Sequence, residues 1–432
     1  MSTYPNTIKN GLSGALRNSA WAKLQNVDGS TNKSEAKPDL VCFSHLRWDF
    51  VYQRPQHLLS RAARDRRVFF VEEPFFDNGS MHLECHKRED DVIVVVPHLP
   101  HGLSSEVATN AVLRDMVDRL FTIHNINKFV SWYYTPAALP FTEHLVPVAT
   151  IYDCMDELSA FKGACPKLRE KEQTLMQRAD LVFTGGQSLY EAKRDQHHSV
   201  FAFPSSIDRN HFGQARQITI EPEDQKNIPH PRLGFFGVID ERFDVGLLGQ
   251  VATARPDWQF VIIGPVVKID EDVLPRNENI HYLGSKKYQE LPSYLAGWDV
   301  ALLLFARNEA TRFISPTKTP EYLAAGKPVV STSIQDVVRP YGQEGLVSIA
   351  DTPDEFIGTV ERILGQKERT EWLARVDNFL KEMSWDETWS RMSNLIDGAV
   401  ENNVTASTDQ VRSSARSLRA NGKAATATAR AL

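Results

Sequence analysis

The sequence has few cysteines and no long apolar run. Its four cysteines, Cys42, Cys85, Cys154 and Cys165, match neither a zinc-ligand spacing nor a disulfide framework, which favours a reducing compartment. No stretch approaches the roughly 18 apolar residues that a membrane-spanning helix needs. The opening residues MSTYPNTIKN lack the charged and apolar segments of a secretion signal. We therefore expect a cytoplasmic protein that is neither secreted nor inserted in a membrane.

The sequence also lacks an excess of positive charge, because its formal net charge is -6 at pH 7. Nucleic-acid phosphates call for a basic surface, so nucleic acid is not an expected partner. Hydrophobic residues make up 42% and charged residues 24% of the chain, as in ordinary globular proteins. A chain of 432 residues predicts two or three domains, and the expected ligand is small.

Short β-branched runs alternate with longer helical patterns in two successive series, which is typical of parallel α/β domains. The strands expected in the first series span 39–44, 67–74, 92–97, 128–134, 148–154, 180–185 and 199–204. Those of the second series span 233–237, 259–265, 279–284, 299–305, 328–333 and 346–350. Parallel sheets bind ligands at the carboxyl ends of their strands, so we expect the site between the two domains.

Composition divides the chain further. We expect disordered residues 1–37, an N-terminal domain at 38–216, a linker at 217–232, a C-terminal domain at 233–383, a closing helix at 384–401 and a disordered basic tail at 402–432. The two ends hold too few aliphatic side chains to offset the entropy of ordering. The tail contains Arg412, Arg416, Arg419, Lys423 and Arg430, and a solvated terminus is favoured over a membrane-surface or partner-binding segment.

The densest chemical pattern spans residues 314–330, ISPTKTPEYLAAGKPVV. Thr319 is the expected N-cap of a helix, Pro320 its first residue and Gly326 its left-handed stop. Ser315 and Thr317 then lie just before the helix, where free N–H groups favour an anion. The alternative is that the Ser-Pro and Thr-Pro pairs only punctuate the helix.

Two charged side chains strengthen this pattern. Lys318 adds a positive charge, and Glu321 offers a carboxylate that can accept hydrogen bonds from ribose hydroxyls. Together they predict a site for a nucleoside diphosphate. The alternative for Glu321 is a solvated acid that complements the helix dipole. The whole block, after a strand and a polar loop, favours the functional interpretation.

Glycines end three expected strands of the C-terminal domain. Gly237 allows the backbone to approach a ligand closely, and we place Gly264 and Gly284 in the same donor site. Arg242, in the turn after Gly237, can bind a phosphate through two hydrogen bonds. A solvated loop charge is an equally good interpretation of Arg242.

Polar residues also follow strands of the N-terminal domain. Asp153 and Asp156 come at the end of 148–154, and His98 and His101 follow 92–97. Each is a candidate general base that takes the proton of an acceptor hydroxyl, with a satisfied loop residue as the alternative.

The loop Ser44–Pro55 follows the first strand and contains no glycine. Its Trp48, Tyr52 and Arg54 suit stacking on a sugar or binding an anionic acceptor. The alternative is that Trp48 simply covers the sheet edge.

The stretch SPTKTPEYLAAGKPVVST resembles the donor-site helix of GT-B glycosyltransferases related to glycosyltransferase family 4. GFFGVIDERFD resembles the first turn of their donor domain, and NIHYLG resembles the loop beside the base. SHLRWDFVYQRPQHLLSRAARDRRVFFVEEP is similar to a bacterial subgroup near the teichuronic-acid and surface-polysaccharide enzymes. The ordered similarity covers about residues 38–400.

The resemblance implies a GT-B fold, with two Rossmann-like domains that face a central cleft. The N-terminal domain would hold a glycan, lipid-linked or other cell-surface polysaccharide acceptor, and the C-terminal domain the nucleotide-sugar. Such enzymes need no metal, so no cofactor is expected, and the acid run at Asp270 is expected to be solvated surface. Many retaining members use the leaving phosphate instead of a protein base. A cytoplasmic enzyme with peripheral contact at the inner face of the membrane fits this family.

One position departs from the family. Its paired-glutamate pattern has a first Glu eight residues before the second, where this chain has Phe313. In family members that carboxylate faces the transferred sugar or the reaction centre, and the spacing of nearby Glu309 does not match. The alternatives to a glycosyltransferase are therefore a catalytically silent nucleotide- or carbohydrate-binding protein and a nucleotide-sugar epimerase.

Overall fold

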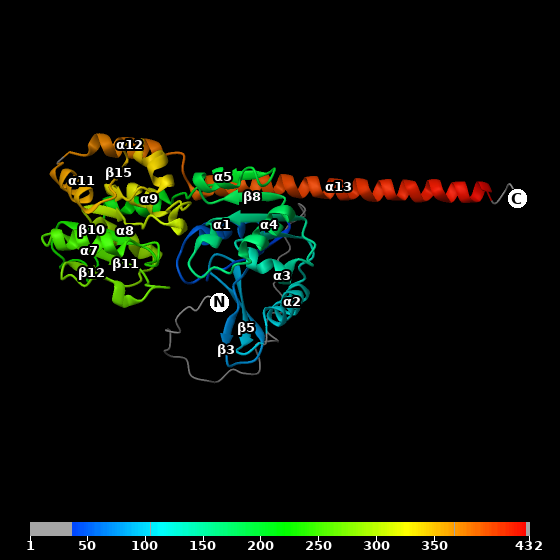
Figure 1. The fold of residues 1–432 in the computed structure, drawn as a ribbon. Helices are drawn as coiled ribbons and strands as arrows, with labels where there is room; N and C mark the ends of the chain where they lie inside the picture. The colour runs from blue at the N-terminus through cyan, green and yellow to red at the C-terminus, as the bar shows by residue number, and fades with distance from the viewer. Residues whose placement is uncertain (1–36, 104, 367, 429–432) are drawn as a thin grey trace.

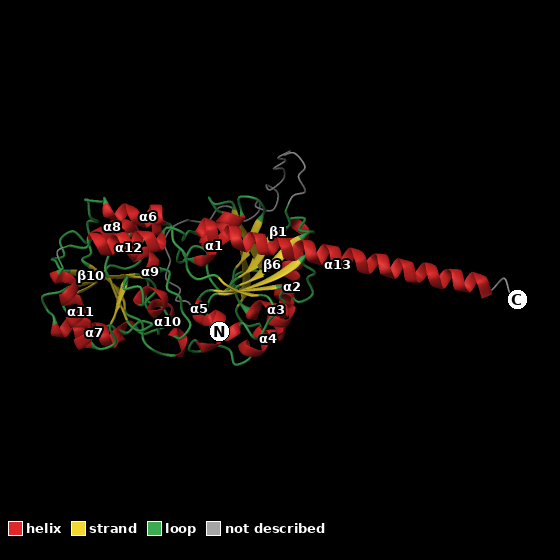
Figure 2. Cartoon of the chain, turned by 90° about the horizontal axis from the view of Figure 1, so that it is seen from above, coloured by secondary structure: helices red, strands yellow, loops and turns green. Residues whose placement is uncertain are grey.

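The computed structural model describes residues 37–103, 105–366 and 368–428. Two α/β domains lie beside each other, and helices cover both faces of each sheet (Figures 1 and 2). Residues 1–36 and 429–432, which we expected to be disordered, lie outside the described residues.

The N-terminal sheet contains β1 (Asp39–Phe43), β2 (Val68–Val71), β3 (Phe75–Asp77), β4 (His82–Lys87), β5 (Val92–Pro100), β6 (Phe129–Tyr133), β7 (Ala149–Cys154), β8 (Leu181–Thr184) and β9 (Val200–Ala202). Its parallel order is β3-β5-β2-β1-β6-β7-β8-β9, and β4 pairs antiparallel with β5. Its helices are α1 (Arg54–Ala62), α2 (Glu106–Ile123), α3 (Leu139–Thr142), α4 (Leu168–Arg178) and α5 (Gln187–Lys193). We expected the N-terminal domain to continue to 216, but α6 (Arg209–Gly213) lies with the C-terminal domain (Figure 2), where Phe212 packs in the core that contains Phe236.

The C-terminal sheet contains β10 (Arg232–Phe236), β11 (Gln259–Ile263), β12 (Ile280–Tyr282), β13 (Val300–Leu303), β14 (Val329–Ser331) and β15 (Val347–Ile349). Its order is β12-β11-β10-β13-β14-β15, with every neighbouring pair parallel. Its helices are α7 (Val245–Ala254), α8 (Leu291–Ala296), α9 (Lys318–Ala324), α10 (Gln335–Val337), α11 (Pro353–Gly365) and α12 (Thr370–Leu380).

Alternation along the strands builds a core on each face of the sheets. In β1, Leu40 and Cys42 pack on one face with α1, whereas Val41 and Phe43 pack on the other face with residues of α2 and α4. All expected strands are present. We missed β3 and β4 because β4 has no fully buried residue and β3 spans only three residues, so neither forms an apolar run.

The last helix, α13 (Trp385–Thr428), returns to the N-terminal domain. Trp385, Met392 and Ile396 are buried in its core beside α1. The helix then extends beyond the domain (Figures 1 and 2). We expected the closing helix to end at 401 and a disordered tail from 402, but α13 continues to Thr428. Its proline-free, alanine- and arginine-containing sequence is compatible with a helix.

Two sequence-level expectations concern the whole chain. Among the described residues, every helix falls short of the length and apolar character needed to cross a membrane. Cys42, Cys85, Cys154 and Cys165 are all free thiols.

Candidate active site

The two domains meet along a zone that we call the interdomain junction. On the C-terminal side it includes Ser315, whose carbonyl accepts a hydrogen bond of 2.7 Å from the Ser205 hydroxyl. The Glu241 carboxylate accepts a hydrogen bond of 2.9 Å from the backbone N–H of Lys162, in the loop region after β7. The carboxyl ends of β7 and β10 therefore approach each other, as expected for a site between two parallel sheets.

Three glycines that we assigned to the donor site lie together after β10, β11 and β12. Gly237, Gly264 and Gly284 have φ of 145°, 139° and 68°, in the region that favours glycine. Gly237 N–H donates to Ile263 O at 2.8 Å, and Gly264 N–H donates to Gly284 O at 2.9 Å. A Cβ on Gly264 would lie 1.8 Å from Gly237 O. Side chains are thus excluded where the turns at 237 and 264 meet.

Lys318 crosses the first of these turns. A Cβ on Gly237 would lie 2.0 Å from its Cε atom, so the glycine makes room for the lysine. Lys318 is the first residue of α9, whose N-cap is Thr317 rather than the expected Thr319, and Pro320 is the third helical residue. The prediction of the helix stop is confirmed, because Gly326 has φ of 73°.

Glu321 is buried and Lys318 is half-buried, and the Lys318 ammonium lies 5.8 Å from the ring centre of Phe235. Neither the Lys318 Nζ nor the Glu321 carboxylate has a hydrogen bond or an ion pair within the described chain, and Glu321 is 5% exposed. Burial lowers the pKa of Lys318 to about 8 and raises the pKa of Glu321 to about 7, and each charge opposes the shift of the other. Buried polar groups in folded proteins are nearly always hydrogen-bonded. Two unpaired charges three residues apart on one helix face therefore indicate a ligand site.

Arg242 lies at the junction, but much of its guanidinium is occupied. Its Nε and Nη2 atoms donate to Asp240 Oδ1 at 3.0 Å and Oδ2 at 2.7 Å. The guanidinium carbon lies 5.3 Å from the ring centre of Phe161, in the N-terminal domain. Asp240 accepts from Nε and from one N–H of Nη2, so Nη1 and the second N–H of Nη2 remain available to a phosphate without rearrangement.

Asp156 lies on the opposite side of the junction, two residues after β7. Within the described part of the chain, its carboxylate takes part in no hydrogen bond or ion pair. Burial raises its pKa, and the nearby charges of Arg242 and Lys318 act against this rise. The structure thus brings this candidate base close to the donor-side cations.

Asp153 and Arg54, which we assigned to different roles, instead pair with each other. Arg54 Nη2 lies 2.9 Å from Asp153 Oδ1, and Arg54 Nε lies 3.0 Å from Oδ2. Nη1 donates to the Phe203 carbonyl at 2.7 Å. Asp153 is 0% and Arg54 3% exposed, so the pair links α1 to β7 inside the domain. This geometry offers neither side chain to an acceptor.

Trp48 and Tyr52 occupy different surroundings. Trp48 is 6% exposed and packs edge-on against Phe70 in the core, so it covers the sheet as in our alternative interpretation. Tyr52 is 37% exposed and stacks on Tyr288 of the C-terminal domain, with ring centres 4.4 Å apart. Only Tyr52 of this pair lies at the junction.

His98 is remote from Asp156. Its ring nitrogens lie 3.0 Å from Asp77 Oδ2 and 3.0 Å from Glu84 Oε2, on β3 and β4. Strands β2, β1 and β6 separate β5 from β7, which corresponds to about 19 Å at the usual strand spacing. His98 therefore cannot act at the same atom as Asp156. His101, at the same end of the sheet, is exposed.

Phe313, at the position of the family's first glutamate, packs against the N-terminal core that contains Phe43. The side chain of Glu309 is 78% exposed and pairs with Arg312, so it does not replace the missing carboxylate. Asp270 caps a short exposed turn through Asp272 N–H at 3.0 Å. In the part of the chain that the structure describes, no three His, Cys, Asp or Glu residues are grouped to hold a metal ion.

Sequence reasoning missed two residues of the junction. His45 directly follows Ser44 at the end of β1, and its buried Nδ1 has no hydrogen-bond partner. Burial, together with the charge of Lys268, lowers the pKa of His45 to about 4, so the imidazole is neutral. Its place after a central strand could have singled it out. Tyr288, four residues after Gly284, was the second omission.

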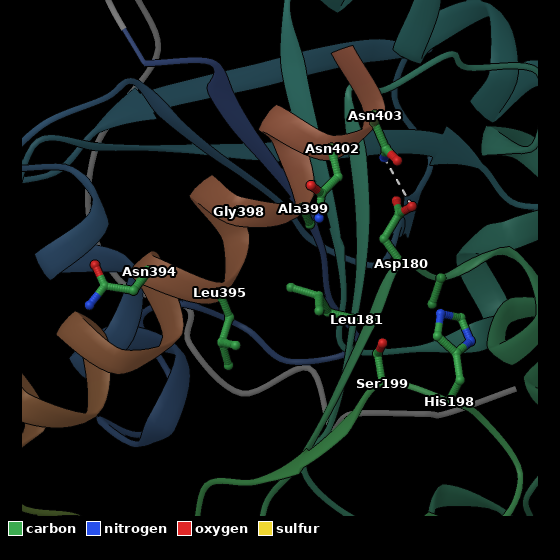
Figure 3. A pocket seen from close by; sticks show the side chains of 11 residues that line it. Asp180, Leu181, His198, Ser199, Asn394, Leu395, Gly398, Ala399, Asn402 and Asn403 are labelled. Atoms are coloured by element: carbon green, nitrogen blue, oxygen red, sulfur yellow. Dashed lines mark hydrogen bonds between the residues drawn. The ribbon is translucent and has the colours of Figure 1, made fainter. Parts of the chain in front are cut away.

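A pocket of about 450 Å³ lies elsewhere, between α13 and the starts of β8 and β9 (Figure 3). Asp180, Leu181 and Ser199 line it, and Asn403 donates to Asp180 at 2.9 Å. These are the amino ends of the strands, opposite the edge that holds Asp156. Because parallel sheets bind ligands at the carboxyl ends, we place the site at the junction and not in this pocket.

Comparison with known proteins shows which family and fold the chain resembles. Residues 231–366 match the family model described as Glycosyl transferases group 1. The putative teichuronic acid biosynthesis glycosyltransferase TuaH of Bacillus subtilis (strain 168) is 26% identical over 262 residues. The match covers 55% of this chain and 64% of that relative, somewhat less than two thirds of its length.

Solved structures share the architecture. Sucrose-phosphate synthase from Thermosynechococcus elongatus has a TM-score of 0.61 at 13% identity, covering 84% of this chain and 99% of its own. WaaG, a glycosyltransferase involved in lipopolysaccharide biosynthesis, has a TM-score of 0.58 at 13% identity, covering 83% and 100%. At such identities the likeness concerns the fold alone. The chain therefore has the expected GT-B fold of glycosyltransferases and contains a group 1 glycosyltransferase domain at residues 231–366.

Proposed function

We propose that the protein is a glycosyltransferase that moves a sugar from a nucleotide-sugar to a glycan or lipid-linked acceptor. The observation that supports this most strongly is the pair of a half-buried Lys318, which crosses the turn at Gly237, and a buried Glu321, neither of which has a hydrogen-bond or ion-pair partner in the described residues. A nucleoside diphosphate supplies an anion for the lysine and ribose hydroxyls for the carboxylate. One ligand thus satisfies both charges.

The transfer is metal-independent in this proposal. Lys318, Nη1 of Arg242 and the free N–H groups near Ser315 and Thr317 balance the leaving diphosphate. The turns at Gly264 and Gly284 border the nucleoside, in line with the resemblance of the segment to the loop beside the base.

The acceptor lies on the N-terminal side, next to Asp156, His45 and Tyr52. Asp156 takes the proton of the acceptor hydroxyl if configuration is inverted, whereas a retaining reaction uses the leaving phosphate. The name of the Bacillus subtilis relative supports a cell-surface polysaccharide acceptor. The basic residues from Arg412 onward support a cytoplasmic protein with peripheral contact at the inner face of the membrane.

Phe313 favours a second candidate, a catalytically silent nucleotide- or carbohydrate-binding protein on the same fold, because the family's first carboxylate is absent. A donor panel separates the candidates. Thermal-shift measurements with UDP-, GDP- and ADP-sugars first identify the nucleotide, since a ligand of the folded state raises its stability. Release of the nucleoside diphosphate is then measured with and without glycan acceptors. Acceptor-dependent release supports a transferase, binding without release a silent protein, and an epimerised donor an epimerase.

A further inference from the structure

Tyr288 lies where three parts of the chain meet. Its ring centre is 4.4 Å from that of Tyr52 in the N-terminal domain and 4.3 Å from that of His211 on α6. His57 of α1 contacts it edge-on at 5.5 Å. The Tyr288 carbonyl oxygen also lies 3.0 Å from Nε2 of His211, within hydrogen-bond distance. The ring is therefore held on two sides, and the direction of its hydroxyl is fixed.

The Tyr288 hydroxyl is buried and has no hydrogen-bond partner. A buried tyrosine hydroxyl normally finds one, because an unmade hydrogen bond is costly. Burial and the nearby charge of Glu321 both raise the pKa of Tyr288, so the phenol is protonated and able to donate. Tyr288 also packs against His211 and Phe212 of α6, and α6 packs on α9, so this hydroxyl and the unpaired Glu321 carboxylate occupy one region of the junction.

On the basis of the proposed donor site, we propose that Tyr288 is a ribose-binding residue whose hydroxyl donates a hydrogen bond to a hydroxyl oxygen of the nucleotide ribose. Glu321 accepts from the ribose hydroxyls, and a ribose hydroxyl can both donate and accept. The donor and the acceptor group of the protein therefore complement one sugar ring. Because Tyr52 supports the ring from the N-terminal domain, this contact joins both domains to the nucleotide.

Tyr288→Phe keeps the stacked ring and removes only the hydroxyl. UDP, GDP and ADP are titrated into the wild type by calorimetry, and the tightest ligand is then compared with its 2′-deoxy and 3′-deoxy forms. We expect the variant to bind the ribonucleotide about 3- to 10-fold more weakly, the usual effect of one neutral hydrogen bond. It should also lose the wild-type preference for the ribonucleotide over one deoxy form. Tyr294→Phe is the matched control, because its hydroxyl donates to Asp224 at 2.8 Å.

The outcomes are distinct once thermal unfolding confirms that the variants are folded. One outcome is that Tyr288→Phe binds ribo- and deoxynucleotides as the wild type does, while Lys318→Ala binds the nucleoside diphosphate weakly. In that case the ribose contact of Tyr288 is wrong, and the proposed donor site stands. If the wild type binds no nucleoside diphosphate, the donor site and the ribose contact are both overturned. An equal loss for Tyr288→Phe and Tyr294→Phe also overturns the contact.

Discussion

Replacing Lys318 with alanine tests the proposed donor site directly. The amine crosses Gly237 and makes no hydrogen bond or ion pair in the described residues, so its removal breaks no such protein contact. A charge-assisted hydrogen bond to phosphate contributes about 1.5–3 kcal/mol. Its loss corresponds to about 10- to 150-fold weaker binding of the nucleoside diphosphate. The bare nucleoside has no phosphate and should bind both proteins equally.

Calorimetric titration with UDP or GDP, and with the matching nucleoside, measures this difference. Lys381→Ala is the control, because Lys381 is an exposed lysine after α12 and should not affect binding. Without ligand, Lys318→Ala should be about as stable as the wild type, since the half-buried amine makes no hydrogen bond or ion pair in the described residues. A folded Lys318→Ala protein that binds the diphosphate as tightly as the wild type would show that α9 is not the donor site.

Three further predictions concern other charged residues. Glu321→Gln should weaken nucleoside and nucleoside diphosphate alike in titrations, unlike Lys318→Ala. Because the folded pKa of Glu321, about 7, exceeds its usual 4.5, its contribution to stability is present below pH 4.5 and lost as pH rises to 7. Urea unfolding of the wild type should show this loss relative to Glu321→Gln, and parallel profiles would contradict it. Asp156→Asn should lower kcat about 10²- to 10⁴-fold with unchanged donor affinity; unchanged turnover would favour His45 or a reaction without a protein base. Arg54→Leu leaves Asp153 buried and unpaired and should reduce the free energy of unfolding by about 3–5 kcal/mol; a smaller loss than that of an exposed Arg64→Leu control would refute a structural role.

The strands and the close grouping of Ser315, Lys318 and Glu321 could be predicted because their evidence is local. Each sheet strand of the C-terminal domain is a short apolar run, and Ser315, Lys318 and Glu321 fall within seven positions of one another. Residues this close in the sequence, between a strand and the start of the next helix, lie near one another in any fold that contains these two elements. The same applies to Gly237, which directly follows β10.

The N-terminal assignments depended on contacts between distant residues, which composition and spacing do not reveal. Arg54 and Asp153 are 99 positions apart, and each is a sensible ligand until the other is seen beside it. We expected His98 to follow a strand as Asp156 does, but β5 continues to Pro100, so His98 lies within it, and the strand order places β5 near the sheet edge. The exposed strands β3 and β4 then supply the two carboxylates that hold its ring.

Phe313 is both a local departure from the family's sequence pattern and a contact between distant parts of the chain. Where the family has a carboxylate at the reaction centre, this chain has an aromatic ring that packs on the N-terminal domain. Two hydrogen bonds extend this contact between the domains. The Ser315 carbonyl accepts from the Ser205 hydroxyl, and the Asp336 carboxylate of α10 accepts from the Ser188 N–H at 2.9 Å. Gly186 leaves room for this, since a Cβ there would lie 2.1 Å from Asp336 Oδ2. The loop around Phe313 is thus fixed to the N-terminal domain by packing and hydrogen bonds. Under the proposed function, polar groups at the reacting sugar must then come from the N-terminal side, where the Asp156 carboxylate and Nδ1 of His45 have no hydrogen-bond partner among the described residues.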